Sequence, residues 1–390
     1  MPLLRVPATI FSLVFVLSFF SVLSFAIVAP IAHAEPVSIG AHAFWYRGPV
    51  RSMALSGATV AETYSGSMLD NPAAMVFQSS LLTGDFCYGQ PIDESISTAS
   101  SVSLSQSFRM IGGTVLPLDF FAMGVTYQTL NFRSINKPDS LRTLTFSDDI
   151  SELDFASALR IGEYFSIGGA ISNADSVREI DLAFSDGLSF SGHSRATGST
   201  TYKAGIQSRF GKVFSLGLFY REPSHFSLAN SGELSLEFFD ASYHPRVVQA
   251  GFVLRPFAMA QKSGPFSLQN LAIAAQVDQY KFTDLPGNGK IYSAPGVVFG
   301  AVDAYELNTK DAYIPRIGVE LPVVTTWIFS TYTRFGSYYE PAYLKNGRSR
   351  YHATVGALVR FWYFAFEGAF DAARSYNNWN YGAGLSFEFD

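Results

Sequence analysis

The sequence is poor in charged residues and contains a single cysteine. Asp, Glu, Lys and Arg make up 15% of its 390 residues, whereas a typical soluble domain has about 25%. One cysteine, Cys87, excludes an internal disulfide framework and a multi-thiolate metal site. The formal net charge of -5 provides no basic stripe for a phosphate backbone. We therefore expect no nucleic-acid partner.

Long hydrophobic runs are confined to the N-terminus. Arg5 precedes an apolar run over residues 8–28, and Ala32-His33-Ala34 stands just before Glu35. This order is typical of a secretory signal peptide with an A-x-A cleavage site, and a retained membrane anchor is the alternative. We predict that residues 1–34 are a signal peptide and that the chain is exported. Beyond residue 34 no stretch approaches the roughly 18 to 20 apolar residues of a spanning helix, so passage through a membrane would require strands.

Hydrophobic and aromatic residues are abundant: they make up 48% and 15% of the chain, with 36 Phe and 20 Tyr. From about residue 79 onward they alternate with other residues at period two, which is typical of a strand whose faces meet different surroundings. In the last stretch, Leu385, Phe387 and Phe389 share one face, and Ser386 and Glu388 share the other. One face suits lipid and the other suits a wet lumen.

This pattern predicts about 14 strands joined alternately by short and long connections, as in a transmembrane antiparallel β-barrel. A secreted soluble sandwich or propeller is the alternative. The predicted strands lie at 81–89, 98–116, 119–132, 152–161, 164–172, 201–210, 213–220, 246–255, 268–281, 313–321, 326–337, 351–361, 363–371 and 379–389. We therefore divide the chain into a signal peptide (1–34), an N-terminal segment (35–78) and a barrel (79–390).

The N-terminal segment does not alternate and is rich in small residues. A barrel of about 14 strands is wider than an eight-stranded one, which side chains can fill. We therefore expect residues 35–78 to form a hatch inside the lumen. The segment contains Asn71-Pro72-Ala73, in which proline restricts both itself and Asn71 and favours a stiff turn. We predict that this turn braces the hatch against the wall; an ordinary surface turn is the alternative.

At this point the sequence resembles the outer-membrane long-chain fatty-acid transporter family, the FadL/TodX type. The resemblance rests on Asn71-Pro72-Ala73 and on three consecutive blocks, residues 315–320, 333–341 and 352–356. It implies a monomeric barrel of fourteen strands with a hatch, placed in the outer membrane by the barrel assembly machinery, and a kink in an early strand. Gly124 is the candidate for that kink, because an interior strand glycine often marks a bulge or a close backbone approach; ordinary lumen packing is the alternative.

Several charged residues are expected to face the lumen. They are Glu152, Arg160, Lys203, Arg209, Arg316, Arg334, Arg360 and Glu367. They are candidates for guiding an amphipathic head group; the alternative is that they pair across the lumen and hold the wall.

The sequence carries no catalytic pattern that we recognise. The histidines after the signal segment are scattered, and neither H-E-x-x-H nor G-x-S-x-G nor a phosphate-binding glycine loop occurs. We expect no enzyme activity, no cofactor and no metal. The predicted function is passive transfer of long-chain fatty acids or other hydrophobic small molecules, including aromatic hydrocarbons, across the outer membrane. The alternatives are a barrel scaffold or shuttle of a protein secretion system and a general porin.

Overall fold

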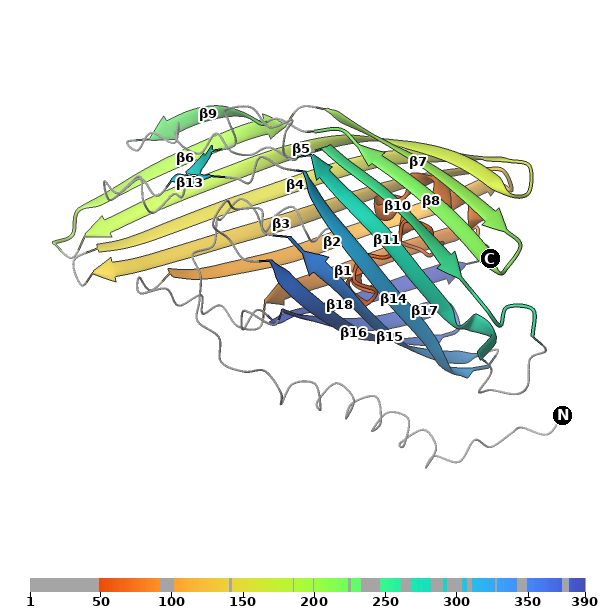
Figure 1. Cartoon of the computed structure of the whole chain (residues 1–390). Helices are drawn as coiled ribbons and strands as arrows, with labels where there is room; N and C mark the ends of the chain where they lie inside the picture. The colour runs from red at the N-terminus through yellow and green to blue at the C-terminus, as the bar shows by residue number, and fades with distance from the viewer. Residues whose placement is uncertain are drawn as a thin grey trace.

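The chain folds into a closed antiparallel barrel with part of its N-terminal region inside (Figure 1). The computed structural model describes residues 49–91, 102–139, 142–184, 186–198, 200–223, 226–232, 246–260, 268–281, 290–292, 304–306, 311–326, 328–341, 349–373 and 379–389. Strand β1 pairs with β18, where Leu82 stands opposite Phe389, and β4 pairs with β5. These two pairings complete the ring.

The ring contains 14 strands, as the alternation predicted. Its members are β1 (Leu82–Pro91), β2 (Val102–Leu118), β3 (Phe121–Asp139), β4 (Arg142–Ile161), β5 (Phe165–Phe184), β7 (Thr201–Phe210), β8 (Phe214–Arg221), β10 (Arg246–Leu254), β11 (Ala272–Lys281), β14 (Ala312–Thr325), β15 (Phe329–Glu340), β16 (Arg350–Phe361), β17 (Phe364–Ala373) and β18 (Trp379–Phe389). Each contains most of one predicted strand. Among the described helices, none is long and apolar enough to cross a membrane.

One side of the wall is taller than predicted. Strands β3, β4 and β5 run through segments expected to be connections, and β6 (Ser189–Gly198) and β9 (Phe226–Gly232) extend the same sheet (Figure 1). Residues 165–172 of β5, nearer the short turns, pair with β7, and residues 175–183, which we call its upper half, pair with β6. These upper residues are more polar, so their β-structure depends on pairing rather than on a strong apolar alternation. A separate short pair joins β12 (Lys290–Tyr292) and β13 (Ala304–Glu306).

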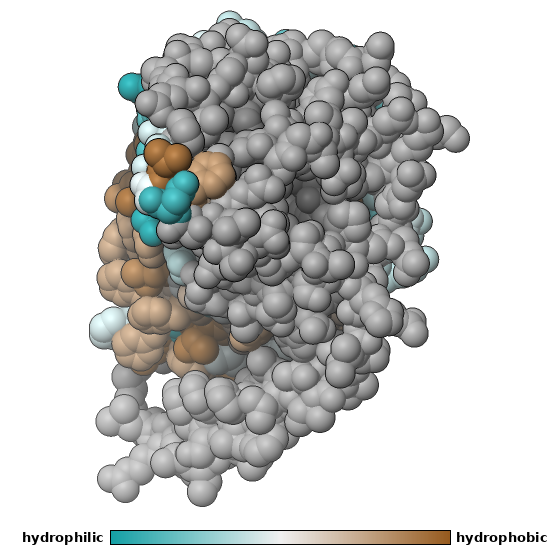
Figure 2. All heavy atoms as spheres, turned by 90° about the vertical axis from the view of Figure 1, so that its left-hand side faces the viewer, coloured by the Kyte–Doolittle hydropathy of each residue, from teal (hydrophilic) through white to brown (hydrophobic). Residues whose placement is uncertain are grey.

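The outer face of the ring is apolar. Figure 2 shows apolar side chains gathered on the flank at the left of the view. Exposed aromatic residues stand at two levels: Tyr127, Tyr202, Tyr220, Tyr313 and Tyr351 toward the long connections, and Phe120, Tyr164, Phe210, Phe257, Trp362 and Tyr363 toward the short turns. Residues 202–210 and 351–361 link the two levels, close to the roughly 9 to 11 residues of a membrane-spanning strand. This is the exterior of a bilayer-spanning barrel with two aromatic girdles.

On β5 the outer face also marks where the apolar belt ends. Ile167 and Ile171 are exposed, and the outward positions that follow are Asn173, Asp175, Val177 and Glu179, three of them polar. The change from isoleucine to polar residues places the upper half of β5 beyond the bilayer, because charged side chains on a lipid-facing wall are costly.

The lumen holds a compact stretch that we call the inner segment, residues 49–80. It contains α2 (Val50–Ala54), α3 (Ser67–Asp70) and the 3-10 helix η2 (Pro72–Phe77), and it is drawn in red to orange within the barrel (Figure 1). Most of its side chains are buried. The expected hatch, residues 35–78, is described only from residue 49 on, and the expected signal peptide lies outside the described residues.

A set of wall glycines, the glycine girdle, allows the inner segment to touch the wall. A Cβ atom at Gly168 would lie 2.5 Å from the backbone N of Ala73, and one at Gly318 would lie 2.8 Å from the carbonyl O of Leu55. The girdle comprises Gly124, Gly168, Gly205, Gly217, Gly251, Gly318, Gly336 and Gly356. Backbone and side chains of the inner segment therefore approach the wall directly at these glycines.

Candidate functional site

The side of the inner segment nearer the short turns carries a network of ion pairs. Arg51 of α2 contacts Glu62 at 3.4 Å and Glu320 of β14 at 3.0 Å. Glu320 also accepts a hydrogen bond from Nε of Arg334 in β15 at 2.6 Å. The NH1 atom of Arg334 lies 3.2 Å from Glu367. Arg255, just after β10, contacts Glu62 at 2.9 Å. These six residues, which we call the ion network, join the inner segment to four wall strands or their ends.

The Asn71-Pro72-Ala73 motif lies against the opposite part of the wall. Asn71 is fully buried; its Nδ2 donates to the carbonyl O of Val60 at 2.8 Å and of Ile206 in β7 at 3.1 Å. Its Oδ1 accepts from the backbone N of Ala73 at 3.1 Å, so it also caps η2. The carbonyl O of Ala73 accepts from the Ser166 hydroxyl at 2.8 Å. A bracing role for this motif is consistent with these contacts.

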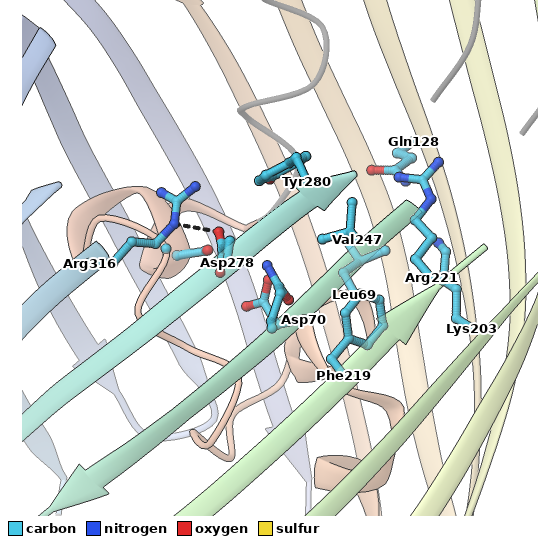
Figure 3. Close-up of a pocket in the computed structure, with 13 residues that line it drawn as sticks. Leu69, Asp70, Gln128, Lys203, Phe219, Arg221, Val247, Asp278, Tyr280 and Arg316 are labelled. Atoms are coloured by element: carbon cyan, nitrogen blue, oxygen red, sulfur yellow. Dashed lines mark hydrogen bonds and ion pairs between the residues drawn. The ribbon is translucent and has the colours of Figure 1, made fainter. Parts of the chain in front are cut away.

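A cavity of about 80 Å³ lies on the side of the inner segment nearer the long connections (Figure 3). Its lining comes from the inner segment and from strands β3, β7, β8, β10, β11 and β14. The lining residues are Ser52, Gly57, Leu69, Asp70, Gln128, Lys203, Phe219, Arg221, Val247, Gln249, Asp278, Tyr280 and Arg316. Charged and amide side chains share the lining with a few apolar ones.

The cations of this cavity are already paired with carboxylates. Lys203 lies 2.8 Å from Glu152 and 2.7 Å from Asp154. Arg316 donates through Nε to Asp278 at 2.6 Å and through NH1 to the carbonyl O of Ser56 at 2.7 Å. Buried charges require such compensation, so these pairs keep the lumen lining close to electrically neutral.

Asp70 is the titratable residue that the inner segment contributes to the cavity lining. Its carboxylate accepts a hydrogen bond from the hydroxyl of Tyr64. Burial raises the pKa of Asp70 to about 6, against the hydrogen bonds from Thr59 and Tyr64, which lower it. Burial likewise raises the pKa of Tyr64, and the neighbouring Asp70 charge adds to that effect. The carboxyl group of Asp70 therefore keeps its proton to a higher pH than an exposed aspartate does.

A second polar cluster lies between β15, β16 and β17. The ring of His352 bonds Glu340 at 2.8 Å and Asp371 at 3.1 Å, and the hydroxyl of Tyr338 donates to Asp371 at 2.8 Å. Tyr338 and His352 are stacked with ring centroids 4.1 Å apart. His352 is buried inside the barrel between these two carboxylates.

The structure also locates the remaining predicted lumen charges. Arg209 points inward and donates to the carbonyl O of Phe77 at 3.2 Å. Arg160 and Arg360 lie near the short turns; Arg360 bonds Glu388 at 2.7 Å and is 39% exposed. The structure brings Glu152 and Lys203 together, and it brings Arg334 and Glu367 together. The paired arrangement favours the alternative in which these charges hold the wall.

Gly124, the candidate for a strand kink, lies in a stretch of β3 whose pairing is regular. The pairing of β3 runs without a register shift from Val115 opposite Met123 to Val102 opposite Asn136 on one side, and it is equally continuous at Gly124 on the other. A Cβ atom at Gly124 would lie 2.5 Å from the Sδ of Met68 and 3.0 Å from that of Met75. The glycine provides space for two methionines of the inner segment, which is the packing alternative.

Sequence reasoning missed the polar residues that complete these clusters. Gln128, Asp278, Glu320 and Arg221 all occupy inward positions of alternating strands, so the period-two pattern was the signal available for finding them. The wall glycines that meet the inner segment carried a signal too, because they recur at inward positions. Within the described residues, no group of three or more His, Cys, Asp or Glu side chains has the geometry to hold a metal ion.

Comparison with known proteins is informative at the level of structure. No protein-family model matches the sequence, and no curated protein matches it significantly. A Pseudomonas aeruginosa FadL homologue is similar over 92% of this chain and 100% of its own, at a TM-score of 0.60 and 13% identity. The toluene transporters TbuX of Ralstonia pickettii and TodX of Pseudomonas putida follow at TM-scores of 0.57 and 0.56, with 11% and 10% identity. They cover 89% and 87% of this chain, and 99% and 97% of their own chains are matched. The chain thus has the fold of the FadL/TodX-type outer-membrane barrels.

Proposed function

We propose that this chain is an outer-membrane barrel that transfers hydrophobic small molecules passively across the membrane. The single observation that carries the proposal is a complete ring of strands, apolar outside, whose lumen is occupied by an inner segment packed against wall glycines. The similarity in fold to the FadL homologue and to the toluene transporters supports the same class of function. Long-chain fatty acids and aromatic hydrocarbons are the substrates we would test first.

The domain organisation belongs to this proposal. Residues 1–34 would direct export and be removed, and residues 35–78 would serve as the hatch. The barrel would be inserted by the outer-membrane assembly machinery and would work as a monomer in contact with outer-membrane lipid. The apolar belt and the two aromatic girdles support this location, because such surfaces are stable only in a bilayer.

A general porin is the less favoured alternative. An open porin needs a continuous water-filled channel, whereas here the inner segment occupies part of the lumen and contacts the wall through the glycine girdle and the ion network. We expect conductance in planar bilayers to be small. Large and steady single-channel currents from the unaltered protein would favour the porin alternative.

The other alternative is a barrel that acts as a scaffold or shuttle in protein secretion. Liposome uptake separates it from transport: the full chain is reconstituted into liposomes, and entry of labelled oleate and labelled toluene is followed against protein-free liposomes. We expect faster entry of at least one of the two compounds with the protein. Entry no faster than in protein-free liposomes, with a correctly folded barrel, would contradict the transport proposal.

A further inference from the structure

The lining of the cavity has an apolar part and a polar part. Leu69, Val247 and Phe219 lie together at one side, and Tyr280 adds a second aromatic ring (Figure 3). The rest of the lining consists largely of charged and amide side chains. Sites with this division bind molecules that combine an apolar body with a few polar groups.

The volume of the cavity limits what can enter. At about 80 Å³ it is smaller than the roughly 150 Å³ apolar cavity known to bind benzene, and its polar lining differs from that dry type of site. It therefore fits a small polar group together with the adjoining part of a ring, rather than a long alkyl chain.

The charges around the cavity disfavour an anion. Lys203 is held by Glu152 and Asp154, and Arg316 by Asp278. Arg221 also has Glu152 as a partner, at 3.6 Å. An entering carboxylate would have to compete with these carboxylates for each cation and would approach Asp70 and Asp278 as well. Like charges in such a site oppose binding.

One hydrogen-bond acceptor in the lining, Oε1 of Gln128, has no donor within the described residues. Gln128 is 5% exposed, and its Nε2 donates to Glu152 at 3.1 Å. Its Oε1 is buried and has no hydrogen-bond partner in the part of the chain that the structure describes. Figure 3 shows the Gln128 oxygen on the side that faces Tyr280. A buried acceptor left without a donor is costly, so a ligand that supplies an O–H or N–H gains the bond that a hydrocarbon cannot make.

We propose that the cavity binds the hydroxyl-bearing end of an uncharged aromatic molecule, with its hydroxyl donating to Oε1 of Gln128 and its ring lying against Phe219 and Tyr280. This inference rests on the proposed function and narrows its substrate class. It distinguishes a phenol-type ligand both from a hydrocarbon, which lacks the donor, and from a carboxylate, which carries the wrong charge.

Three ligands of nearly the same shape test the proposal: 4-methylphenol, toluene and 4-methylbenzoate. The full chain is reconstituted into lipid nanodiscs, and binding is measured at neutral pH by titration calorimetry with empty nanodiscs as the blank. We expect 4-methylphenol to bind about tenfold more tightly than either of the others, which corresponds to one hydrogen bond gained in a buried site. Equal or tighter binding of toluene or 4-methylbenzoate would overturn the inference.

Gln128→Leu removes the acceptor while keeping a side chain of similar size. In this variant we expect the preference for 4-methylphenol over toluene to disappear, with toluene binding unchanged. Gln279→Leu is the matched control, because Gln279 lies on β11 outside the cavity and bonds Asp311 and the hydroxyl of Tyr313, each at 3.0 Å. A preference that survives in Gln128→Leu would contradict the assigned contact.

Folding of both variants is checked by the gel shift between boiled and unboiled samples. If Gln128→Leu does not fold, the ligand series with the unaltered protein decides the matter alone. Failure of the proposed function has a different signature: neither oleate nor toluene would enter liposomes faster with the protein than without it. Uptake of these compounds without any preference for 4-methylphenol would overturn this inference and leave the transport proposal standing.

Discussion

The two faces of the inner segment are built differently. Toward the short turns, Arg51 and Glu62 are tied to Arg255, Glu320 and Arg334 by the ion network. Toward the long connections, Asp70 and Leu69 line a cavity. The face with the ion network joins the inner segment to the wall, whereas the other face borders a cavity that contains an acceptor without a donor, Oε1 of Gln128. The cavity and the ion network therefore lie on opposite sides of the inner segment.

The strongest way to break this contrast is to separate the inner segment from the wall at the girdle. Gly168→Val would push its side chain into the backbone of Pro72 and Ala73, and neither can give way without shifting η2. Overpacking alone costs about 1–3 kcal/mol, and more where backbone must move. We expect bilayer conductance to rise several-fold.

Gly169→Val is the matched control for that experiment. Gly169 is the neighbour of Gly168 on the opposite face of β5, and the nearest atom to an added Cβ lies 3.5 Å away. We expect its conductance to equal that of the unaltered protein. A rise of the same size in both variants would show that the wall itself, rather than its contact with the inner segment, is sensitive.

The ion network can be weakened by replacing Arg334, which is fully buried. Arg334→Met leaves Glu320 and Glu367 without this partner, and breaking a buried ion pair in this way costs about 3–5 kcal/mol. Urea denaturation in detergent measures the loss. Arg360→Met, at a pair with Glu388 that is partly exposed, should cost only about 0–1 kcal/mol. Equal losses in the two variants would argue against a special role for the ion network.

Loss of the Asn71 hydrogen bonds should have a smaller effect on the free energy of unfolding. Asn71→Ala leaves the carbonyl groups of Val60 and Ile206 without these donors and removes the cap on η2, so we expect a loss of about 2–3 kcal/mol. Hydrogen exchange should increase at residues 71–77. Asn173→Ala, on the exposed outer face of β5, should change stability by less than about 0.5 kcal/mol. Unchanged exchange in Asn71→Ala would remove the bracing role.

The smallest expected effect is the contribution of Asp70, on the cavity side of the inner segment, to the pH dependence of the free energy of unfolding. The pKa of Asp70 is raised to about 6 in the folded chain, above the ordinary value near 3.9. The folded state therefore holds this proton more tightly, and stability decreases as the pH rises from about 4 through 6. Urea titrations give the free energy of unfolding at pH 5 and at pH 7. In Asp70→Asn we expect the difference between these two values to lose the contribution of Asp70, about 1–2 kcal/mol. An unchanged pH dependence would contradict it.

Much of the wall could be predicted from the sequence, because alternation is a local property. Each residue of a strand points to the face opposite its neighbours, so Leu385 and Ser386 disclose their surroundings without knowledge of any partner strand. The same rule correctly placed Lys203 and Arg334 inside. Tyrosine is harder to place by this rule, because it suits both a lipid interface and a polar lumen. Tyr338 is buried inside against His352.

The amino-acid sequence by itself determined the strands, their inward and outward faces and the position of a non-alternating segment before them. Only the tertiary structure decided which inward residues meet. Arg51 and Glu320 are 269 residues apart, and Ser56 and Thr354 are 298 residues apart and bonded at 2.8 Å. The physical reason is that such contacts depend on the register of all the strands around the closed ring and on how the inner segment docks, neither of which any local pattern encodes.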